Sequence, residues 1–189
     1  ADLVCCTAAH NETGIIPDLA VLLERVRDDA VVCVDAAQSC GRLPALPRRI
    51  DAIVASAHKM GGIAGAGALL LRGRARALPA PWAGGGQEGG LRPGTAALCA
   101  IAALGAAAAD VEHTRAAHAP LGALRDRLER ELTLAWGARA LGVDGPRLSN
   151  TTALVVPGVD GAALRIAIDI AGVCAGFGAA CSALAPAPS

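Results

Sequence analysis

The sequence predicts an α/β fold with a mainly parallel sheet. Short apolar runs alternate along the chain with longer segments of helical character, which is typical of α/β proteins. The apolar runs lack polar alternation, as expected for strands that are covered on both faces. Apolar residues make up 53% of the 189 residues, enough to bury a sizeable core and too many for a disordered chain.

The first part of the chain is expected to form four strands and one helix. Each strand is a short run of Val, Ile, Leu or Ala, and Pro17 suits the first position of a helix that continues to about Asp29. The expected strands are Leu3–Thr7, Ala30–Val34, Ile50–Ala55 and Ala66–Leu71.

Helices dominate the expected structure after residue 95. A long helix is predicted over Thr95–His118, and Pro120 separates it from a second helix over Leu121–Leu134. Leucines at helical spacing on the second helix form a stripe that we expect to face a core. The stripe consists of Leu121, Leu124, Leu128 and Leu132.

The last part of the chain is expected to contain two short strands and a helix, followed by a glycine-rich loop. The expected elements are strands near Ala138–Leu141 and at Thr151–Val156, and a helix over Gly161–Ala171. A shift in composition near residues 115–120 marks the boundary between two substructures. We therefore divide the chain into residues 1–117 and residues 118–189.

Charge and hydropathy exclude two classes of partner. Lys and Arg together number 17 and Asp and Glu also number 17, which argues against binding to nucleic acid or to an acidic membrane surface. The two longest uncharged runs lie at residues 93–109 and 170–189. The first is rich in Ala and the second is broken by Gly and Pro, so neither predicts a membrane-spanning helix.

The cysteines and the chain ends bear on location and completeness. Seven cysteines without regular spacing, in a chain with no recognisable signal peptide, indicate reduced thiols in a cytoplasmic protein. No C-x-x-C pair occurs, so we expect no metal site. The chain opens without Met and closes on an Ala/Pro stretch, and we expect it to be a fragment.

Lys59 is the first candidate for chemistry. It follows the predicted strand Ile50–Ala55, and α/β sheets bind their ligands at the carboxyl ends of strands. It is also the only lysine among 17 basic residues, although Arg could serve any surface role. Because Arg cannot form an imine, a lone Lys at this place indicates a Schiff-base nucleophile; the alternative is a loop lysine on the surface.

Asp35 and Gln38 are the second candidates. Asp35 ends the strand Ala30–Val34, where its carboxylate could face the same crevice as Lys59. In enzymes that use pyridoxal phosphate (PLP), such an Asp keeps the pyridine nitrogen protonated. Taken alone, Asp35 could equally cap a helix and Gln38 could be exposed.

Five segments, in this order, resemble the class V aminotransferase family and most closely its cysteine desulfurases. They are HNETG at residues 10–14, V-D-x-x-Q-x-x-G at 34–41, S-x-H-K at 56–59, the glycine-rich segment at 84–95, and GAACS at 178–182. The resemblance implies the PLP-dependent fold type I. Residues 1–117 would be part of the PLP-binding large domain and residues 118–189 part of the small α+β domain.

The resemblance also implies how PLP is held. Lys59 would bind it as a Schiff base, Asp35 would pair with its pyridine nitrogen, and Gln38 would hydrogen-bond its ring hydroxyl. Ser56 and His58 would contact its phosphate, whose charge needs several donors.

Three further residues acquire roles from the resemblance. Asn11 would lie beside the cofactor, and Thr95 would reach the phosphate held by the partner subunit of a homodimer. Cys181 would accept sulfur as a persulfide, so that Lys59, His58 and Cys181 form the predicted catalytic set. Cys174 follows an apolar helix and is expected to be packed and structural.

The implied activity is conversion of L-cysteine to L-alanine. The sulfur would pass to an acceptor protein for iron–sulfur cluster assembly or thiolation. Another class V enzyme, such as a selenocysteine lyase, is one alternative. A truncated, non-catalytic remnant is another, because Gly89 stands where the family has Arg and because family segments at both ends have no counterpart here. For the latter reason the isolated fragment is expected to be inactive.

Overall fold

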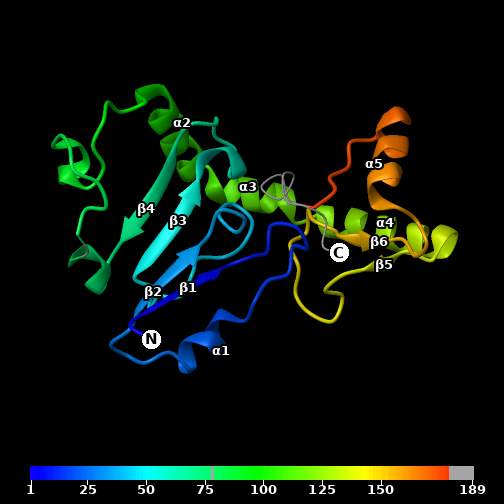
Figure 1. Cartoon of the computed structure of the whole chain (residues 1–189), viewed down its shortest axis with the longest axis horizontal. Coiled ribbons are helices and arrows are strands. Elements are labelled where there is room, and N and C mark those ends of the chain that lie inside the picture. The colour runs from blue at the N-terminus through cyan, green and yellow to red at the C-terminus, as the bar shows by residue number, and fades with distance from the viewer. Residues whose placement is uncertain (78, 179–189) are drawn as a thin grey trace. The chain divides into compact units, whose positions relative to one another are not determined.

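A computed structural model describes residues 1–77 and 79–178, and these fall into two compact units (Figure 1). Unit 1 contains Ala1–Ala9 and Ile16–Ala119. Unit 2 contains His10–Ile15 together with the chain from Pro120 onward. The assignment of the two parts of the chain to a PLP-binding domain and a small domain stays a prediction.

Unit 1 is built on a four-stranded sheet in the order β1-β2-β3-β4. The strands are Leu3–Thr7 (β1), Val31–Asp35 (β2), Ala52–Ser56 (β3) and Gly67–Leu71 (β4). The first three are parallel to one another, and β4 runs antiparallel to β3. The prediction of an α/β fold with a mainly parallel sheet is therefore confirmed, and the expected strands agree with the observed ones to within two residues.

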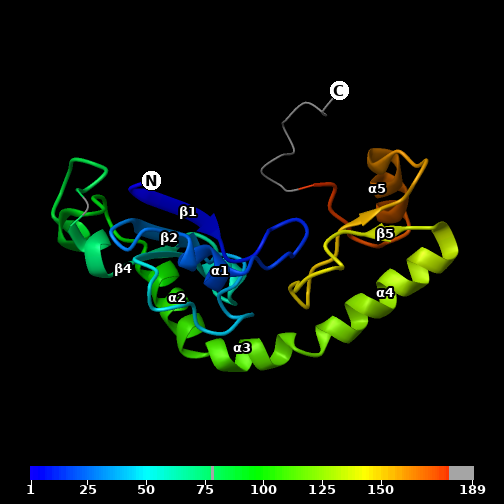
Figure 2. The same ribbon diagram turned by 90° about the horizontal axis from the view of Figure 1, so that it is seen from below.

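One face of the sheet is covered by the helix α1 (Leu19–Glu24). Val32 and Val34 of β2 are fully buried on this face, and Leu19 and Leu23 of α1 pack against their cluster. The ribbon of α1 lies beside the sheet (Figure 2). Because side chains alternate along a strand, Cys33 and Asp35 point to the opposite face. That opposite face is more exposed in the described residues.

The start of α1 differs from the expectation. The helix begins at Leu19 rather than at Pro17, because Asp18 is the N-cap and its carboxylate accepts from the backbone N–H groups of Ala20 and Val21. It also ends at Glu24, so the predicted extension to Asp29 is wrong.

The predicted helix over Thr95–His118 is two helices. α2 covers Leu98–Ala109 and α3 covers Val111–His118, separated at Asp110. Asp110 leaves the helical conformation (φ −97°, ψ 13°), which fits a residue whose side chain competes for backbone hydrogen bonds. Thr95 does not cap α2, since the N-cap is Ala97 and no side chain caps the helix there.

Unit 2 contains α4 (Leu121–Trp136), the short strand pair β5 (Arg139–Ala140) and β6 (Leu154–Val155), and α5 (Gly161–Ile170). All four lie within the expected positions or extend them slightly. The predicted burial of the leucine stripe on α4 is wrong in part, since Leu124 and Leu128 are exposed. The buried residue of α4 is instead Glu129.

Glu129 is buried because a polar network satisfies its carboxylate. Arg147 donates to it through two nitrogens, at 2.6 and 2.9 Å, and Thr152 Oγ1 donates at 2.5 Å. This bidentate ion pair connects α4 to the segment that precedes β6. Residues 10–15 join the same unit, since Leu148 N donates to Gly14 O and Ile15 forms a bridge with Arg147.

No helix in the described part of the chain is both long and apolar enough to span a membrane.

Candidate active site

The candidate site lies at the carboxyl ends of the three parallel strands of unit 1. In the register of the sheet Thr7 pairs with Asp35, and Asp35 pairs with Val54, two residues before Ser56. Thr7, Asp35 and Ser56 therefore stand on one face of the sheet at one edge. This is the place at which open α/β sheets bind their ligands.

Lys59 follows directly from β3 in a tight turn. It ends the 3₁₀ helix η1 (Ala57–Lys59), which begins at the buried Ala57 and is followed by the buried Met60. Ala57 O accepts from both Met60 N, at 3.1 Å, and Gly62 N, at 2.9 Å. The backbone is thus anchored on both sides of Lys59, whose own side chain is half-buried.

Glycine at position 62 avoids crowding in this turn. A Cβ at Gly62 would lie 3.2 Å from both Cβ and O of Ala57 and 3.3 Å from Ala103 O of α2. The close approach lets α2 pack behind the turn that carries Lys59. It gives a physical reason for glycine three residues after the lysine.

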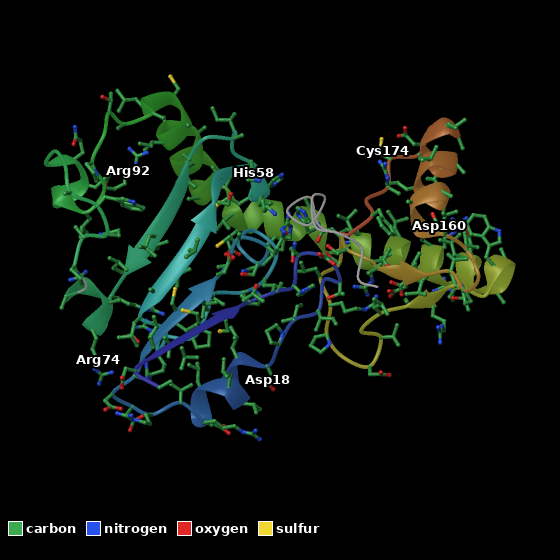
Figure 3. All side chains as sticks on the ribbon, in the orientation of Figure 1. Asp18, His58, Arg74, Arg92, Asp160 and Cys174 are labelled. Atoms are coloured by element: carbon green, nitrogen blue, oxygen red, sulfur yellow. The ribbon has the colours of Figure 1, made fainter. Side chains whose placement is uncertain are left out.

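Ser56 and His58 form a pair at the same strand end. Ser56 Oγ and His58 Nδ1 share a hydrogen bond of 3.0 Å, and the His58 ring is exposed (Figure 3). The pair offers a hydroxyl and an imidazole to an anionic group. The structure therefore brings Ser56, His58 and Lys59 together.

Asp35 keeps an exposed carboxylate at the end of β2. Its Oδ1 accepts from Ala37 N at 2.8 Å, and the next residue, Ala36, is tied to β3 by a hydrogen bond from its N to Val54 O at 2.9 Å. The alternative that Asp35 caps a helix is not realised, because the chain beyond it forms hydrogen-bonded turns. Its second oxygen, Oδ2, accepts no hydrogen bond from the described residues.

Gln38 is held by a residue that the sequence analysis did not single out. Arg42 Nη1 donates to Gln38 O at 2.7 Å and to Gln38 Oε1 at 3.0 Å. In the sequence, the only sign of this pair is that Gln38 and Arg42 are four residues apart, a spacing that brings side chains together in a helical turn. Gly41, next to Arg42, has φ +75°, and a Cβ at this position would lie 3.4 Å from Met60 Cβ, so this loop runs close to the residue that follows Lys59.

Three predicted site residues lie outside this group. Asn11 is exposed in unit 2, in a loop where His10 Nδ1 accepts from Thr13 N at 3.2 Å. Thr95 is exposed, and among the described residues it makes no hydrogen bond with the other predicted cofactor ligands. Cys181 lies outside the residues that the structure describes. The roles of all three stay predictions.

Three thiols in or near the sheet, those of Cys6, Cys33 and Cys40, are poor nucleophiles. Burial, followed by the neighbouring Asp35, raises the pKa of the Cys40 thiol. Burial is also the main cause that raises the pKa of Cys6 and of Cys33, both of which lie beside Cys5. A protonated thiol is not the reactive form of cysteine. The expectation that Cys174 is packed is wrong, since it is exposed (Figure 3).

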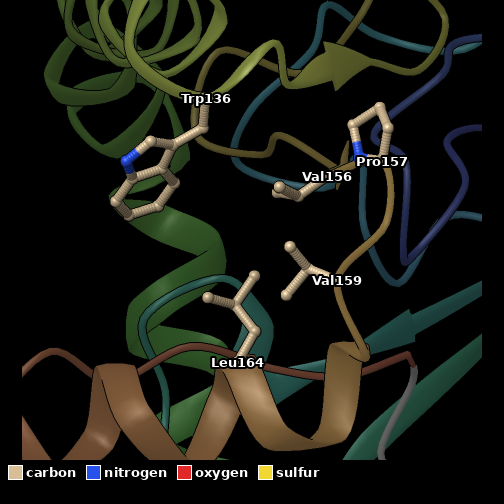
Figure 4. Close-up of a pocket in the computed structure, with 5 residues that line it drawn as sticks. All are labelled: Trp136, Val156, Pro157, Val159 and Leu164. Atoms are coloured by element: carbon tan, nitrogen blue, oxygen red, sulfur yellow. The ribbon is translucent and has the colours of Figure 1, made fainter.

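The concave regions of each unit are open and mainly apolar. In unit 1 a cavity of about 370 Å³ lies between residues 61–63 and α2, with Asp110 at its margin. In unit 2 a cavity of about 370 Å³ is lined by Trp136, Val156, Pro157, Val159 and Leu164 (Figure 4). The second has no titratable lining group. Within the described ranges, no group of three His, Cys, Asp or Glu side chains could hold a metal ion.

Comparisons with known proteins show which family the chain belongs to. The family model "Aminotransferase class-V" matches residues 1–188. The chain is 34% identical over 193 residues to a cysteine desulfurase of Klebsiella pneumoniae and 38% identical over 191 residues to one of Cereibacter sphaeroides. Each alignment covers 99% of this chain but only 48% and 49% of the relative. The chain thus spans about half the length of these relatives.

Solved structures show the same partial match. A NifS-like protein from Rickettsia africae superposes with a TM-score of 0.86 at 29% identity, covering 94% of this chain and 50% of that one. DndA from Streptomyces lividans superposes with a TM-score of 0.74 at 32% identity, covering 89% and 49%.

Proposed function

Because the chain belongs to the class V aminotransferase family, we propose that it acts as a PLP-dependent cysteine desulfurase. The predicted PLP-dependent fold type I is confirmed by the solved relatives. The observation that carries the proposal is that Asp35 and Ser56 lie on one sheet face at the carboxyl ends of neighbouring strands, with the turn to Lys59 directly after Ser56.

The side chains at this edge fit PLP. The half-buried Lys59 offers the only lysine amine of the chain, and Asp35 offers an exposed carboxylate for the protonated ring nitrogen. Ser56 and His58 offer a paired hydroxyl and imidazole for the phosphate. When bound, PLP supplies an electron sink for the substrate carbon.

Each residue would contribute by binding or by moving a proton. Lys59 attaches the cofactor, and Asp35 Oδ2, which accepts no hydrogen bond from the described residues, can accept a hydrogen bond from the protonated ring nitrogen. His58 can hold or release a proton at Nδ1, the atom that faces Ser56 Oγ. Asn11 and a partner subunit's copy of Thr95 complete the proposed contacts, so the active form would be a homodimer.

The sulfur step balances without an external oxidant. The C–S bond of L-cysteine breaks, its carbon gains hydrogen to give L-alanine, and an S–S bond forms to Cys181 Sγ. The carbon is reduced by two electrons while the two sulfurs together lose two electrons, and the hydrogen counts match. We propose that the persulfide serves an acceptor protein in the cytoplasm, for iron–sulfur cluster assembly or thiolation.

The direct test uses the status of Lys59 as the sole lysine. Reduction with borohydride after addition of PLP should attach one label, on the peptide that contains Lys59. Lys59→Ala and the charge-conserving control Lys59→Arg should both lose the label and the absorbance of bound PLP, because neither side chain forms an imine. A label that persists in these variants would contradict the assignment.

A further inference from the structure

Arg42 is placed so that it determines which end of the Gln38 amide faces outward. Its Nη1 lies 2.7 Å from Gln38 O and 3.0 Å from the side-chain oxygen Oε1. Arginine carries five N–H donors and no acceptor, so the amide atom that faces it must be the oxygen. The NH₂ group of Gln38 is therefore the end that is free to donate.

The guanidinium group of Arg42 lies in a position that is energetically unfavourable for a charged group. Arg42 is half-buried, and its Nε is buried without a hydrogen-bond partner among the described residues. Burial lowers the pKa of Arg42, against a smaller opposite effect of Cys40. Since an unpaired buried polar group is unfavourable, the two bonds to Gln38 offset only part of the cost of this position.

A glutamine without such a partner would not present one fixed end. Rotation about its last side-chain torsion is broad, so either the oxygen or the NH₂ group can face a ligand. The bond from a cationic group also polarises the amide and strengthens its N–H donors. Arg42 thus fixes the orientation in which the Gln38 side chain presents its NH₂ group as a hydrogen-bond donor.

We propose that Arg42 is a positioning residue, which orients Gln38 so that its NH₂ group donates to the ring-hydroxyl oxygen of PLP. The inference rests on the proposed function, because that function supplies the acceptor. Arg42 itself need not touch the cofactor. Its effect on PLP should therefore depend entirely on Gln38.

The first experiment needs no cofactor. The chain contains only two glutamines, Gln38 and Gln87, so labelling of glutamine side chains with ¹⁵N gives two NH₂ resonance pairs. Arg42→Met should shift the Gln38 pair and leave the Gln87 pair in place, and Arg42→Lys should restore part of the shift. An unmoved Gln38 pair in Arg42→Met, with an unchanged unfolding midpoint, would overturn the orientation by Arg42.

The second experiment titrates PLP alone into the full chain and its variants. Gln38→Ala and Arg42→Met should each weaken PLP binding about tenfold, as expected for one hydrogen bond, and should alter the pH at which the absorbance of bound PLP changes. The double variant should bind no more weakly than Gln38→Ala. Additive losses would show that Arg42 acts independently of Gln38 and would overturn the proposal.

The two experiments separate this inference from the proposed function. Failure of the wild-type chain to bind PLP would contradict the proposed function and remove the proposed acceptor of Gln38. A Gln38 resonance pair that responds to Arg42→Met would still support the orientation of the amide. Normal binding of PLP with additive losses would leave the proposed function standing and overturn the inference alone.

Discussion

The reactive sulfur of the proposed mechanism must be a thiolate, which places a demand on a single cysteine. Among the described cysteines, Cys6, Cys33 and Cys40 have pKa values raised mainly by burial, so each stays protonated at neutral pH. Cys5, Cys99 and Cys174 are exposed and are not excluded by burial. The assignment of the persulfide to Cys181 therefore requires an experiment.

In an enzyme that contains this chain together with the family segments it lacks, we predict that Cys181→Ser abolishes transfer of sulfur from L-cysteine while the absorbance of bound PLP is retained. A hydroxyl cannot form a persulfide, whereas the proposed PLP contacts do not include this residue. Cys174→Ser is the matched control and should transfer sulfur normally. Persulfide content can be measured by alkylation and mass spectrometry. Loss of transfer in Cys174→Ser alone would reverse the assignment.

Single residues differ in how far the sequence reveals them. Lys59 and Asp35 could be predicted because each follows a strand whose apolar run is plain, and the ends of parallel strands share one edge. The role of Arg42 could not be predicted, since it depends on a side-chain conformation that folds back on Gln38. The exposure of Cys174 was missed because an apolar helix need not bury the residue that follows it.

At the scale of elements, strands were predicted better than helix ends. A strand of unit 1 is a continuous apolar run, and its limits coincide with turn residues. Helix ends depend instead on local competition. Asp18, the residue after Pro17, caps α1 so that the helix begins at Leu19, and Asp110 follows a run of alanines and ends α2. On α4, the leucine stripe predicted a buried face that contains Leu124 and Leu128. The buried residue is instead Glu129, which pairs with Arg147.

Gly41→Ala should destabilise unit 1 by about 1–2 kcal/mol, the usual cost of a left-handed conformation for a residue with a Cβ. Gly41 has φ +75°, and a Cβ there would meet Thr114 Cγ2 at 3.3 Å and Met60 Cβ at 3.4 Å. Urea unfolding measures the change. Gly105→Ala is the control, because Gly105 lies inside α2 with open space around it, and it should be stabilising. Equal effects would contradict the argument.

Glu129→Gln should destabilise unit 2 by roughly 3 kcal/mol, because it leaves Arg147 buried without its counter-charge. Glu131→Gln on the same helix removes an exposed pair with Arg127 and should cost less than about 1 kcal/mol. The chain has two tryptophans, Trp82 in unit 1 and Trp136 in unit 2, so fluorescence in a Trp82→Phe background reports on unit 2. Equal losses of unfolding free energy in Glu129→Gln and Glu131→Gln would contradict the claim that a buried ion pair matters more than an exposed one.

The same pair predicts a dependence of stability on pH. The hydrogen bond from Arg147 is the main cause that lowers the pKa of Glu129 below its ordinary value of 4.5. A carboxyl with a lowered pKa stabilises the folded state fully above its unfolded pKa, and this contribution is lost as pH falls through the folded pKa. Unit 2 should therefore lose stability on acidification below about pH 4.5, and Glu129→Gln should flatten that part of the curve.

At the scale of the whole molecule, the division into units could be predicted only in part. A change of composition indicated a boundary near residues 115–120, whereas the transfer of His10–Ile15 to unit 2 rests on contacts with a distant segment. Leu148 N donates to Gly14 O at 2.8 Å across more than a hundred residues of sequence. No local pattern in the HNETG loop encodes such a partner.

The sheet face that carries Asp35 also predicts how the chain behaves in solution. Val54 and Leu69, which are paired neighbours on this face, are 37% and 59% exposed, and exposed apolar neighbours of this kind promote association. We predict that the 189-residue chain self-associates with rising concentration, as measured by sedimentation velocity. Leu69→Arg should lower the mean mass because it places a charge on this face. Leu134→Arg is the control: Leu134 is 87% exposed on α4 of unit 2, and its replacement should leave association unchanged. An equal fall in both variants would mean that total surface hydrophobicity, rather than this sheet face, drives association.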